Sequence, residues 1–183
     1  MVYDPQIHHR RSIRLRGYDY ARPGMYSVTV CTHGKEHLFG ETVEREMKHS
    51  QYAEFAALSW NDLPRHYTYV RLDSFAVMPN HVHGIIEITG DVRAGPRPAP
   101  TPDRTRRQER RGLAEIVCAF KSFSARRINE IRGTGGQPIW QRNYYEHIIR
   151  NQRELEITRE YIATNPMRWD ADPENVMPLW GRV

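Results

Sequence analysis

The sequence has 183 residues, a length that suits one well-packed domain and is short for two. Its 27 Lys and Arg residues outnumber its 22 Asp and Glu residues, and the net charge of +5 with a pI near 9.4 favours an anionic partner. The polar start lacks the apolar stretch of a signal peptide, and no run approaches the ~20 apolar residues of a membrane span. The two cysteines, Cys31 and Cys118, have no metal-binding spacing. We therefore expect a cytoplasmic protein that has reduced thiols and no membrane partner.

Two polar segments carry much of the basic excess. Residues 1–23 are rich in Arg without a clear period and are expected to form a basic arm over the domain. Residues 90–112 are rich in Pro and Arg and almost free of apolar side chains, so they cannot bury enough surface to offset the entropy of ordering. We interpret them as a disordered basic insertion within one domain that spans residues 1–183. Arg dominates Lys in both segments, which favours forked contacts to phosphate.

The first half of the chain alternates β-type and helical patterns. We predict a strand over 25–32, a short returning strand over 38–43, a helix over 48–63 that Pro64 ends, and strands over 70–77 and 81–88. The Pro79-Asn80 pair between the last two strands is a turn sequence, so these strands should form an antiparallel hairpin. In the first of them we expect Val70, Leu72, Ser74 and Ala76 to share one face, against Arg71, Asp73, Phe75 and Val77.

The second half contains two helices that flank a strand. We predict a helix over 113–132, a strand at the latter end of 139–149, and a helix from Asn151 to about Asn165, followed by a tail over 167–183 that is ordered only by docking. Asn151 suits an N-cap with Glu154 as its capping-box partner, and Pro166 should stop the helix. This order of elements predicts an α+β fold with a ferredoxin-like antiparallel sheet and helices mainly on one face.

The stretch that begins at Met78-Pro79-Asn80 contains two histidines of chemical interest. Side chains alternate along a strand, so His81 and His83 share one face, about 7 Å apart, while Val82 and Gly84 share the other. Two neutral imidazoles on one strand face make half of a metal site. The competing interpretation is a pair of half-exposed histidines at the start of a strand.

The last predicted helix contains a tyrosine and an amide one turn apart. Tyr161 and Asn165 are four residues apart and therefore lie on one helical face. An amide oxygen is a ligand for hard divalent cations, and a phenol beside such a cation loses its proton more readily. The competing interpretation is a packed tyrosine followed by an Asn-Pro helix end.

These segments together resemble a known family. Met78-Pro79-Asn80-His81-Val82-His83 resembles the HUH motif (His, bulky hydrophobic, His) of single-tyrosine transposases, and the segment 161–166 resembles their tyrosine helix. The segments 140–145 and 165–169, with 10–15 and 17–20, are similar to the branch called REP-associated tyrosine transposases. The resemblance covers nearly the whole chain except residues 90–112.

The resemblance implies a set of roles. His81 and His83 would bind a divalent ion, Mg or Mn, and Asn165 would be the third ligand where insertion-sequence relatives carry Gln. Tyr161 would be the nucleophile that joins a DNA 5′-phosphate, and the target would be single-stranded DNA with short palindromic repeats that fold into hairpins. No nucleotide cofactor is expected, and the chain would act as a monomer or homodimer. The expected DNA-binding residues are Arg10, Arg11, Arg14, Arg16, Lys121, Arg126, Arg127 and Arg142.

Several alternatives stay open. Tyr144 and Tyr145 compete with Tyr161 as the nucleophile; because they are adjacent in a predicted strand, at most one of them can point to the histidine face. A domesticated relative could bind nucleic-acid hairpins without catalysis, through Arg contacts and aromatic stacking. A plasmid replication or mobilisation nickase of the HUH type is a third interpretation, which the compact chain and the single helix-borne tyrosine disfavour.

Overall fold

The computed structural model describes residues 15, 17–90 and 111–169. In chain order its elements are β1 (Gly24–Cys31), a short 3-10 helix (His33–Lys35), β2 (Gly40–Val43), β3 (Glu46–His49), α1 (Gln51–Asn61), α2 (Leu63–His66), β4 (Val70–Met78), β5 (His81–Ile88), α3 (Leu113–Arg132), β6 (Tyr145–Ile149) and α4 (Gln152–Arg168). No described helix is long and apolar enough to cross a membrane.

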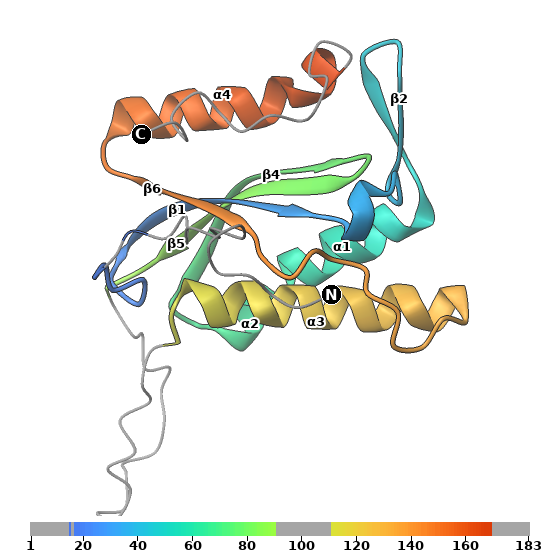
Figure 1. Ribbon diagram of the computed structural model, residues 1–183. Coiled ribbons are helices and arrows are strands. Elements are labelled where there is room, and N and C mark those ends of the chain that lie inside the picture. The colour runs from blue at the N-terminus through green and yellow to red at the C-terminus, as the bar shows by residue number, and fades with distance from the viewer. Residues whose placement is uncertain (1–14, 16, 91–110, 170–183) are drawn as a thin grey trace, which may run out of the picture.

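Four strands form the central sheet, in the order β4-β5-β1-β6, and every neighbouring pair is antiparallel. Strand β1 lies between β5 and β6, so the β1-α1-β4 and β5-α3-β6 units interleave, which is the split β-α-β arrangement. The structure confirms the ferredoxin-like α+β fold. Strands β2 and β3 form a separate hairpin beside the sheet (Figure 1).

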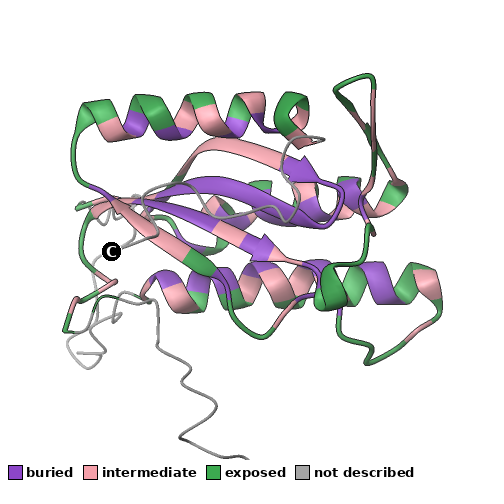
Figure 2. Ribbon diagram, turned by 45° about the horizontal axis from the view of Figure 1, so that its top comes forward, coloured by how far each residue is buried: buried purple, intermediate pink, exposed green. Residues whose placement is uncertain are grey.

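The helices cover both faces of the sheet unequally (Figure 1). Helices α1, α2 and α3 pack on one face over the larger core, as expected for helices mainly on one face. Helix α4 lies alone on the opposite face, where a small cluster joins Ile85 and Ile149 to its Leu155 and Ile162. Buried positions follow the central strands and the helix sides that face them (Figure 2). We call the side of the sheet beneath α4 the α4 face.

The predicted alternation along β5 is confirmed. Val82, Ile86 and Ile88 belong to the larger core, whereas Ile85 belongs to the cluster under α4. Gly84 lies on the core face against Trp60, whose ring stacks on Phe75 at 4.8 Å between centroids. A side chain at position 84 would occupy the space of the indole, so the tight contact requires glycine there.

The predicted alternation along β4 is wrong in its second half, because a β-bulge interrupts the strand. Leu72 pairs with Ile86 and Phe75 pairs with Gly84, so Asp73 and Ser74 together oppose one residue of β5. The extra residue exchanges the faces, and Phe75 therefore joins Leu72 against the larger core. The Asp73 carboxylate accepts hydrogen bonds from Arg159 of α4, at 2.8 Å from Nε and 2.6 Å from Nη2.

The first predicted helix begins later than expected. Ser50 is the N-cap of α1 and its hydroxyl accepts the N–H of Tyr52, while residues 46–49 form β3 instead of the first turn of the helix. A two-residue turn at Glu44 and Arg45, both with positive φ, joins β2 to β3, and the sequence carries no glycine signal for it. Pro64 lies in the first turn of the short α2, where proline is tolerated, so it does not end a helix.

Helix α3 has the predicted bounds, and Gly133 ends it in the left-handed conformation with φ 63°. Asn151 is the N-cap of α4, as predicted, and its side chain accepts the Glu154 N–H at 2.9 Å. The expected capping box is wrong in one detail, because the Glu154 carboxylate accepts the N–H of Arg150, one residue earlier. Pro166 lies inside α4 and does not stop it; contacts made by Trp169 favour the extra turn.

The structure describes only small parts of the three polar segments that the sequence predicts. Most of the predicted basic arm, almost all of the insertion and most of the tail lie outside the described residues. Residues 17–23 are described, and there Tyr18 and Tyr20 pack against Tyr26 of β1, with ring centroids 6.5 and 5.9 Å away. This end of the predicted arm is therefore anchored on the core.

We predict that Gly84→Ala destabilises the fold by about 1–3 kcal/mol, the usual cost of overpacking. The added Cβ would lie 2.7 Å from Cη2 of Trp60, and that ring cannot retreat because Phe75 and Phe120 pack on it. Chemical denaturation measures the change. Gly135→Ala is the control, since nothing lies within 4 Å of its Cβ position; equal stability of the two variants would contradict the packing argument.

We predict that Asp73→Asn lowers stability in a pH-dependent manner. Hydrogen bonding to Arg159 lowers the pKa of Asp73 from 3.8 to about 2. The ion pair therefore contributes fully above pH 3.8, and its contribution is lost as the pH falls from 3.8 towards 2, because the unfolded carboxylate binds a proton first. Denaturant unfolding of both proteins across this range should show curves that converge at low pH. Asp62→Asn is the control, because its partner Arg65 is 83% exposed and such pairs contribute little. Parallel curves for Asp73→Asn and the wild type would contradict the prediction.

Candidate functional site

The two histidines of β5 lie on the α4 face at the end of the β4–β5 hairpin. Antiparallel pairing sets His81 opposite Cys31 of β1, and His83 opposite Thr29. His81 is 2% exposed and His83 is 4% exposed. The structure therefore places both imidazoles in the interior, and neither is a half-exposed strand residue.

The two rings point their Nε2 atoms at each other, 2.8 Å apart. Each Nδ1 atom has a separate partner: His81 Nδ1 lies 2.8 Å from the Asn80 Oδ1, and His83 Nδ1 lies 2.8 Å from the Thr29 hydroxyl. Asn80 is held in turn by its Nδ2, which donates to the Lys35 carbonyl at 3.5 Å. Neighbours on three segments therefore fix both ring planes.

These contacts determine where the protons lie. The Asn80 Oδ1 only accepts, so His81 Nδ1 must carry a hydrogen and its Nε2 presents a lone pair. The Thr29 hydroxyl can donate or accept, so His83 can present either an N–H or a lone pair at Nε2. In the first tautomer His83 donates to His81. In the second, two lone pairs face each other and a cation between them would remove the repulsion.

Both imidazoles are neutral in the folded protein. Burial lowers the pKa of His83 from 6.5 to about 3. Burial, with smaller effects of His83 and Lys35, lowers the pKa of His81 well below its usual value. Neutral imidazole is the form that binds a metal ion, so the environment keeps both rings ready to act as ligands.

Helix α4 and its C-cap residue Trp169 present three side chains to this pair. The Tyr161 ring lies 5.3 Å from the His83 ring, centroid to centroid, at an interplanar angle of 74°. Asn165 is 5% exposed, and its Nδ2 lies 3.4 Å from His83 Nε2. The Trp169 ring lies 5.9 Å from that of His81. Residues four apart share a helical face, so a single stripe of α4 covers the two imidazoles.

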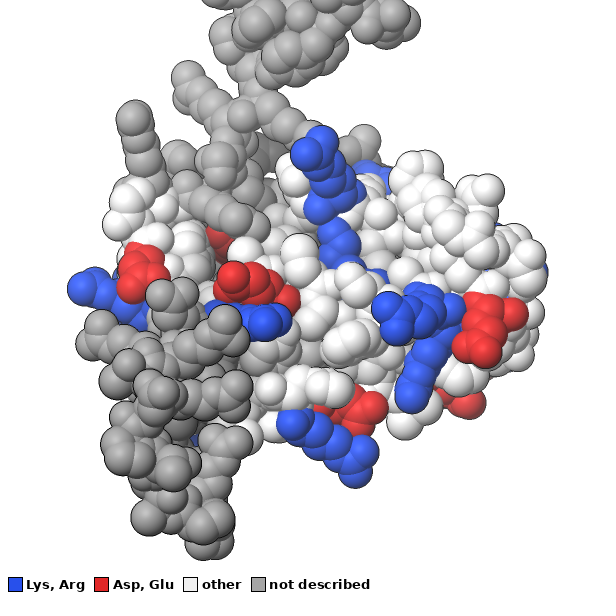
Figure 3. Space-filling view, turned by 90° about the horizontal axis from the view of Figure 1, so that it is seen from below, with Lys and Arg blue, Asp and Glu red and all other residues white. Residues whose placement is uncertain are grey.

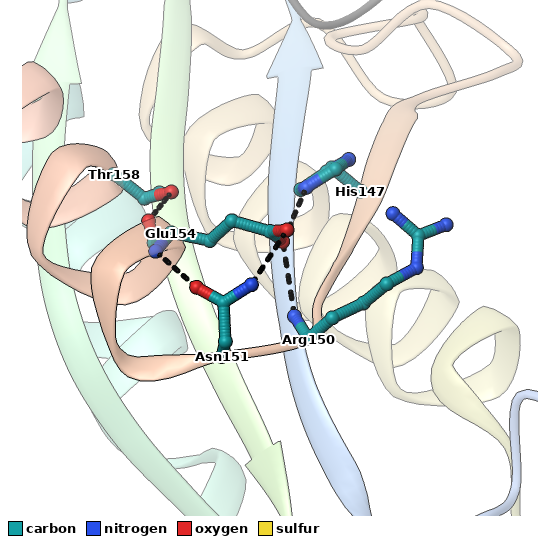
Figure 4. Close-up of polar contacts among 5 residues, drawn as sticks. All are labelled: His147, Arg150, Asn151, Glu154 and Thr158. Atoms are coloured by element: carbon teal, nitrogen blue, oxygen red, sulfur yellow. Dashed lines mark hydrogen bonds and ion pairs between the residues drawn. The ribbon is translucent and has the colours of Figure 1, made fainter.

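A cluster at the start of α4 fixes the position of this helix (Figure 4). The Glu154 carboxylate accepts the Arg150 N–H at 3.0 Å and the Asn151 amide at 3.1 Å, and it lies 3.3 Å from His147 Nε2. Thr158 donates to the Glu154 carbonyl at 2.7 Å. The cluster links β6 to the first turns of α4, and the Asp73–Arg159 ion pair attaches the next turn to β4.

The donor set fits a divalent ion in several respects. Ligands at right angles on an octahedral ion with bonds of ~2.1 Å lie about 3 Å apart, close to the 2.8 Å between the two Nε2 atoms. Each Nδ1 has the hydrogen-bond partner that metal-bound histidines usually have. A half-turn of the Asn165 amide would bring its Oδ1 towards His83. Within the described residues, no group of three or more His, Cys, Asp and Glu side chains could hold a metal, so the set would consist of neutral ligands.

The competing tyrosines point to opposite sides of β6. Tyr144 is 8% exposed and belongs to the larger core, away from the histidines. Tyr145 pairs with Thr29, which pairs on its other side with His83, so Tyr145 shares the α4 face with the two imidazoles. Of these tyrosines, only Tyr161 has a recorded ring contact with a site histidine among the described residues.

The expected DNA-binding residues lie in different places. Arg10, Arg11, Arg14 and Arg16 are outside the described residues. Lys121, Arg126 and Arg127 are on α3, across the sheet from the histidines. That face carries Lys and Arg side chains with Asp and Glu among them (Figure 3). The ammonium of Lys121 donates to the carbonyls of Gln141 and Arg142, and burial lowers its pKa.

Sequence reasoning missed Thr29, Asn80 and Trp169 as parts of the site. Thr29 reaches His83 only through strand register, which the chain order does not reveal. The sequence around Asn80 indicates only a turn. The spacing of four residues from Tyr161 through Asn165 to Trp169 was a signal that could have included the tryptophan.

Known proteins provide three comparisons. No family model matches the chain. A solved structure described as a REP-associated tyrosine transposase bound to a REP hairpin has a TM-score of 0.55 and 18% sequence identity, over 85% of this chain and 73% of that one. At this identity the likeness shows the fold. A Haemophilus influenzae protein described as uncharacterized is 39% identical over 177 residues, covering 93% of this chain and 95% of that protein. The chain therefore belongs to the same protein family as this Haemophilus influenzae protein.

Proposed function

We propose that this protein is a metal-dependent transposase of the HUH single-tyrosine type, which nicks and rejoins single-stranded DNA. One observation carries the proposal: the stripe of α4 that contains Tyr161 and Asn165 faces the converging Nε2 atoms of His81 and His83. A phenol, an amide and two neutral imidazoles in contact are the groups that phosphoryl transfer to a tyrosine needs.

The residues have separate roles in this proposal. His81 and His83 would hold a divalent ion, Mg or Mn, and Asn165 would supply an amide oxygen as the third ligand. When bound, the ion polarises the scissile phosphate and offsets its developing charge. The Thr29 hydroxyl and the Asn80 carbonyl oxygen orient the two rings through their Nδ1 atoms. Since all three ligands are neutral, the charge of the ion remains available to the phosphate.

Tyr161 performs the covalent step. Its phenolic oxygen attacks the phosphorus, the new P–O bond to Tyr161 forms, and the P–O bond to the 3′ oxygen breaks. The phenolic proton passes to solvent, and the departing 3′ oxygen takes a proton from solvent and becomes a hydroxyl. The DNA stays attached as a 5′-phosphotyrosine, a diester that another 3′-hydroxyl can attack in the reverse direction. The bond is conserved, so no nucleotide cofactor is required.

The proposed substrate is hairpin DNA formed by short palindromic repeats. Two observations support it: the sequence resemblance to REP-associated tyrosine transposases, and the fold shared with a protein described as bound to a REP hairpin. The net charge of +5 suits a polyanion. We favour an enzyme over a non-catalytic binding module because the phenol of Tyr161 lies beside the His83 imidazole.

A non-catalytic hairpin-binding module is the second candidate. The observation that favours it is the 2.8 Å Nε2–Nε2 contact, since one imidazole can donate to the other and satisfy the pair without an ion. In that case Tyr161 and Trp169 are packing residues over a neutral core pair. The two candidates differ in whether a covalent adduct forms, which the following variants decide.

We predict that Tyr161→Phe binds hairpin DNA as the wild type does and forms no covalent complex, because only the attacking oxygen is lost. Tyr144→Phe and Tyr145→Phe should retain the adduct. Labelled hairpins incubated with Mn and resolved under denaturing conditions measure adduct formation, and peptide mapping locates the phosphotyrosine. A phosphotyrosine at Tyr144 or Tyr145 would overturn the role of Tyr161, and no adduct with the wild type would favour the binding module.

We predict that His83→Ala abolishes cleavage and leaves hairpin binding largely intact, because the ligand is lost while the Arg contacts remain. The change also leaves the Thr29 hydroxyl and His81 Nε2 without their partner, so stability should fall by about 1–3 kcal/mol. His83→Gln, which retains more volume, is the companion variant. Nicking and binding are measured on the same labelled hairpin. Undiminished nicking by either folded variant in Mn buffer would contradict the metal assignment.

A further inference from the structure

Tyr145 occupies the same row of the sheet as the site histidine. Thr29 of β1 pairs with His83 on one side and with Tyr145 on the other. Neighbouring strands are ~4.8 Å apart, so the Cα atoms of His83 and Tyr145 are about 10 Å apart, with both side chains on the α4 face. A group bound at the histidines would therefore have Tyr145 beside it.

The Tyr145 ring is exposed without an evident structural role. It is 39% exposed, and it is the only aromatic residue among the exposed large hydrophobic side chains of the described part of the chain. Its ring has no recorded aromatic or hydrogen-bond partner among these residues. The adjacent Tyr144 instead packs in the larger core. An aromatic ring that is open to solvent offers a face on which a base can stack.

Two exposed arginines lie near the two ends of the strand that carries this ring. Arg142 and Arg150 lie just before and just after β6, both are exposed, and neither has a recorded ion-pair partner among the described residues. Lys121 holds the Arg142 backbone through its carbonyl at 2.9 Å. Glu154 holds the Arg150 N–H, and the Arg150 side chain extends away from that carboxylate (Figure 4).

The strand that carries these groups is at the edge of the sheet. In the described residues β6 pairs with β1 alone. Between positions 142 and 150 the only carboxylate is that of Glu146, which alternation directs to the core face, opposite Tyr145. Arg150 follows the last residue of β6 and has the same parity as Glu146, so it reaches the edge from the end of the strand and not from the α4 face; there the Glu154 carboxylate accepts its backbone N–H. The edge therefore presents a cation, an aromatic ring and a second cation in chain order, which is the combination that binds single-stranded nucleic acid without sequence readout.

We propose that Arg142, Tyr145 and Arg150 form a contact for single-stranded DNA along β6, with a base next to the scissile phosphate stacked on Tyr145. This inference rests on the proposed function and extends it, because it assigns a positioning residue for the strand. The two guanidinium groups lie at opposite ends of β6, and they contact phosphates further along the DNA strand in either direction from the stacked base. The Tyr145 hydroxyl has no part in the contact, and the ring face supplies the interaction.

Fluorescence anisotropy with the full chain tests the proposal, in EDTA so that cleavage plays no part. The probes are a DNA hairpin with single-stranded thymidine tails and the same hairpin with abasic tails. We expect Tyr145→Ala to weaken binding of the thymidine probe about tenfold, and Tyr145→Phe to bind as the wild type does, since stacking on an aromatic ring has this magnitude. The abasic tails should weaken binding of the wild type but cause little further loss in Tyr145→Ala. Ile131→Ala, which removes a 44% exposed side chain from the opposite face, is the control and should bind normally.

Different outcomes separate this inference from the proposed function. The stacking contact would be overturned if abasic tails weakened binding equally in the wild type and in Tyr145→Ala. It would also be overturned if Tyr145→Phe lost as much binding affinity as Tyr145→Ala. A wild type that forms dimers through β6, with no dependence on the tails, would make the edge an interface between copies of the chain and overturn the DNA contact. If Tyr145→Ala does not fold, quenching of a fluorescent base analogue in the tails by the wild type decides the question. If binding depends on the tail bases but no adduct forms at Tyr161, the proposed nuclease activity is wrong and the stacking contact is retained.

Discussion

Two imidazoles buried with their Nε2 atoms facing each other impose the constraint on which the site depends. A buried ring nitrogen without a partner costs free energy, so each Nδ1 needs a neighbour and the facing Nε2 atoms need a shared proton or cation. Thr29 and Asn80 supply the neighbours. Both come from segments next to β5, so the antiparallel register itself provides the hydrogen bonds that orient the rings. The same register directs Val82 and Ile86 into the larger core, and moving the histidines to the other face would remove these side chains from that core.

The small cluster beneath α4 buries few apolar side chains, so polar contacts must help to hold this helix. The Glu154 cluster fixes its first turn, and the Asp73–Arg159 ion pair fixes the next. The ion pair depends on the bulge in β4, which turns the Asp73 carboxylate towards α4 while Leu72 and Phe75 both stay in the core. The position of Tyr161 is therefore determined by contacts outside the site as well as by its own contact with His83.

The parts of the fold that sequence predicted are those with strong local periodicity. The alternation from His81 onward and the apolar stripe of α3 each follow from one segment, and Asn151 has the local chemistry of an N-cap. The errors arose where distant contacts override local preference. The bulge at Asp73 has no glycine to mark it, the β2–β3 turn uses residues that usually avoid positive φ, and Pro166 is accommodated within α4. The motif predicted that His81 and His83 share a strand face. The position of Thr29 could not be predicted, because it reaches His83 only across strands.

The uncharged histidine pair and the exposed charged side chains are on different residues of the protein. Burial favours the neutral form of the two imidazoles, and two carboxylates that hold α4, those of Asp73 and Glu154, are occupied by hydrogen-bond donors. A phosphate that reached the histidines would therefore meet little repulsion, but also little attraction until a cation is bound. Attraction for a polyanion would come from exposed guanidinium groups, such as those of Arg142 and Arg150, whose effect is screened by salt. Under the proposed function, affinity for nucleic acid and reactivity at Tyr161 arise from different residues, so the two can change independently.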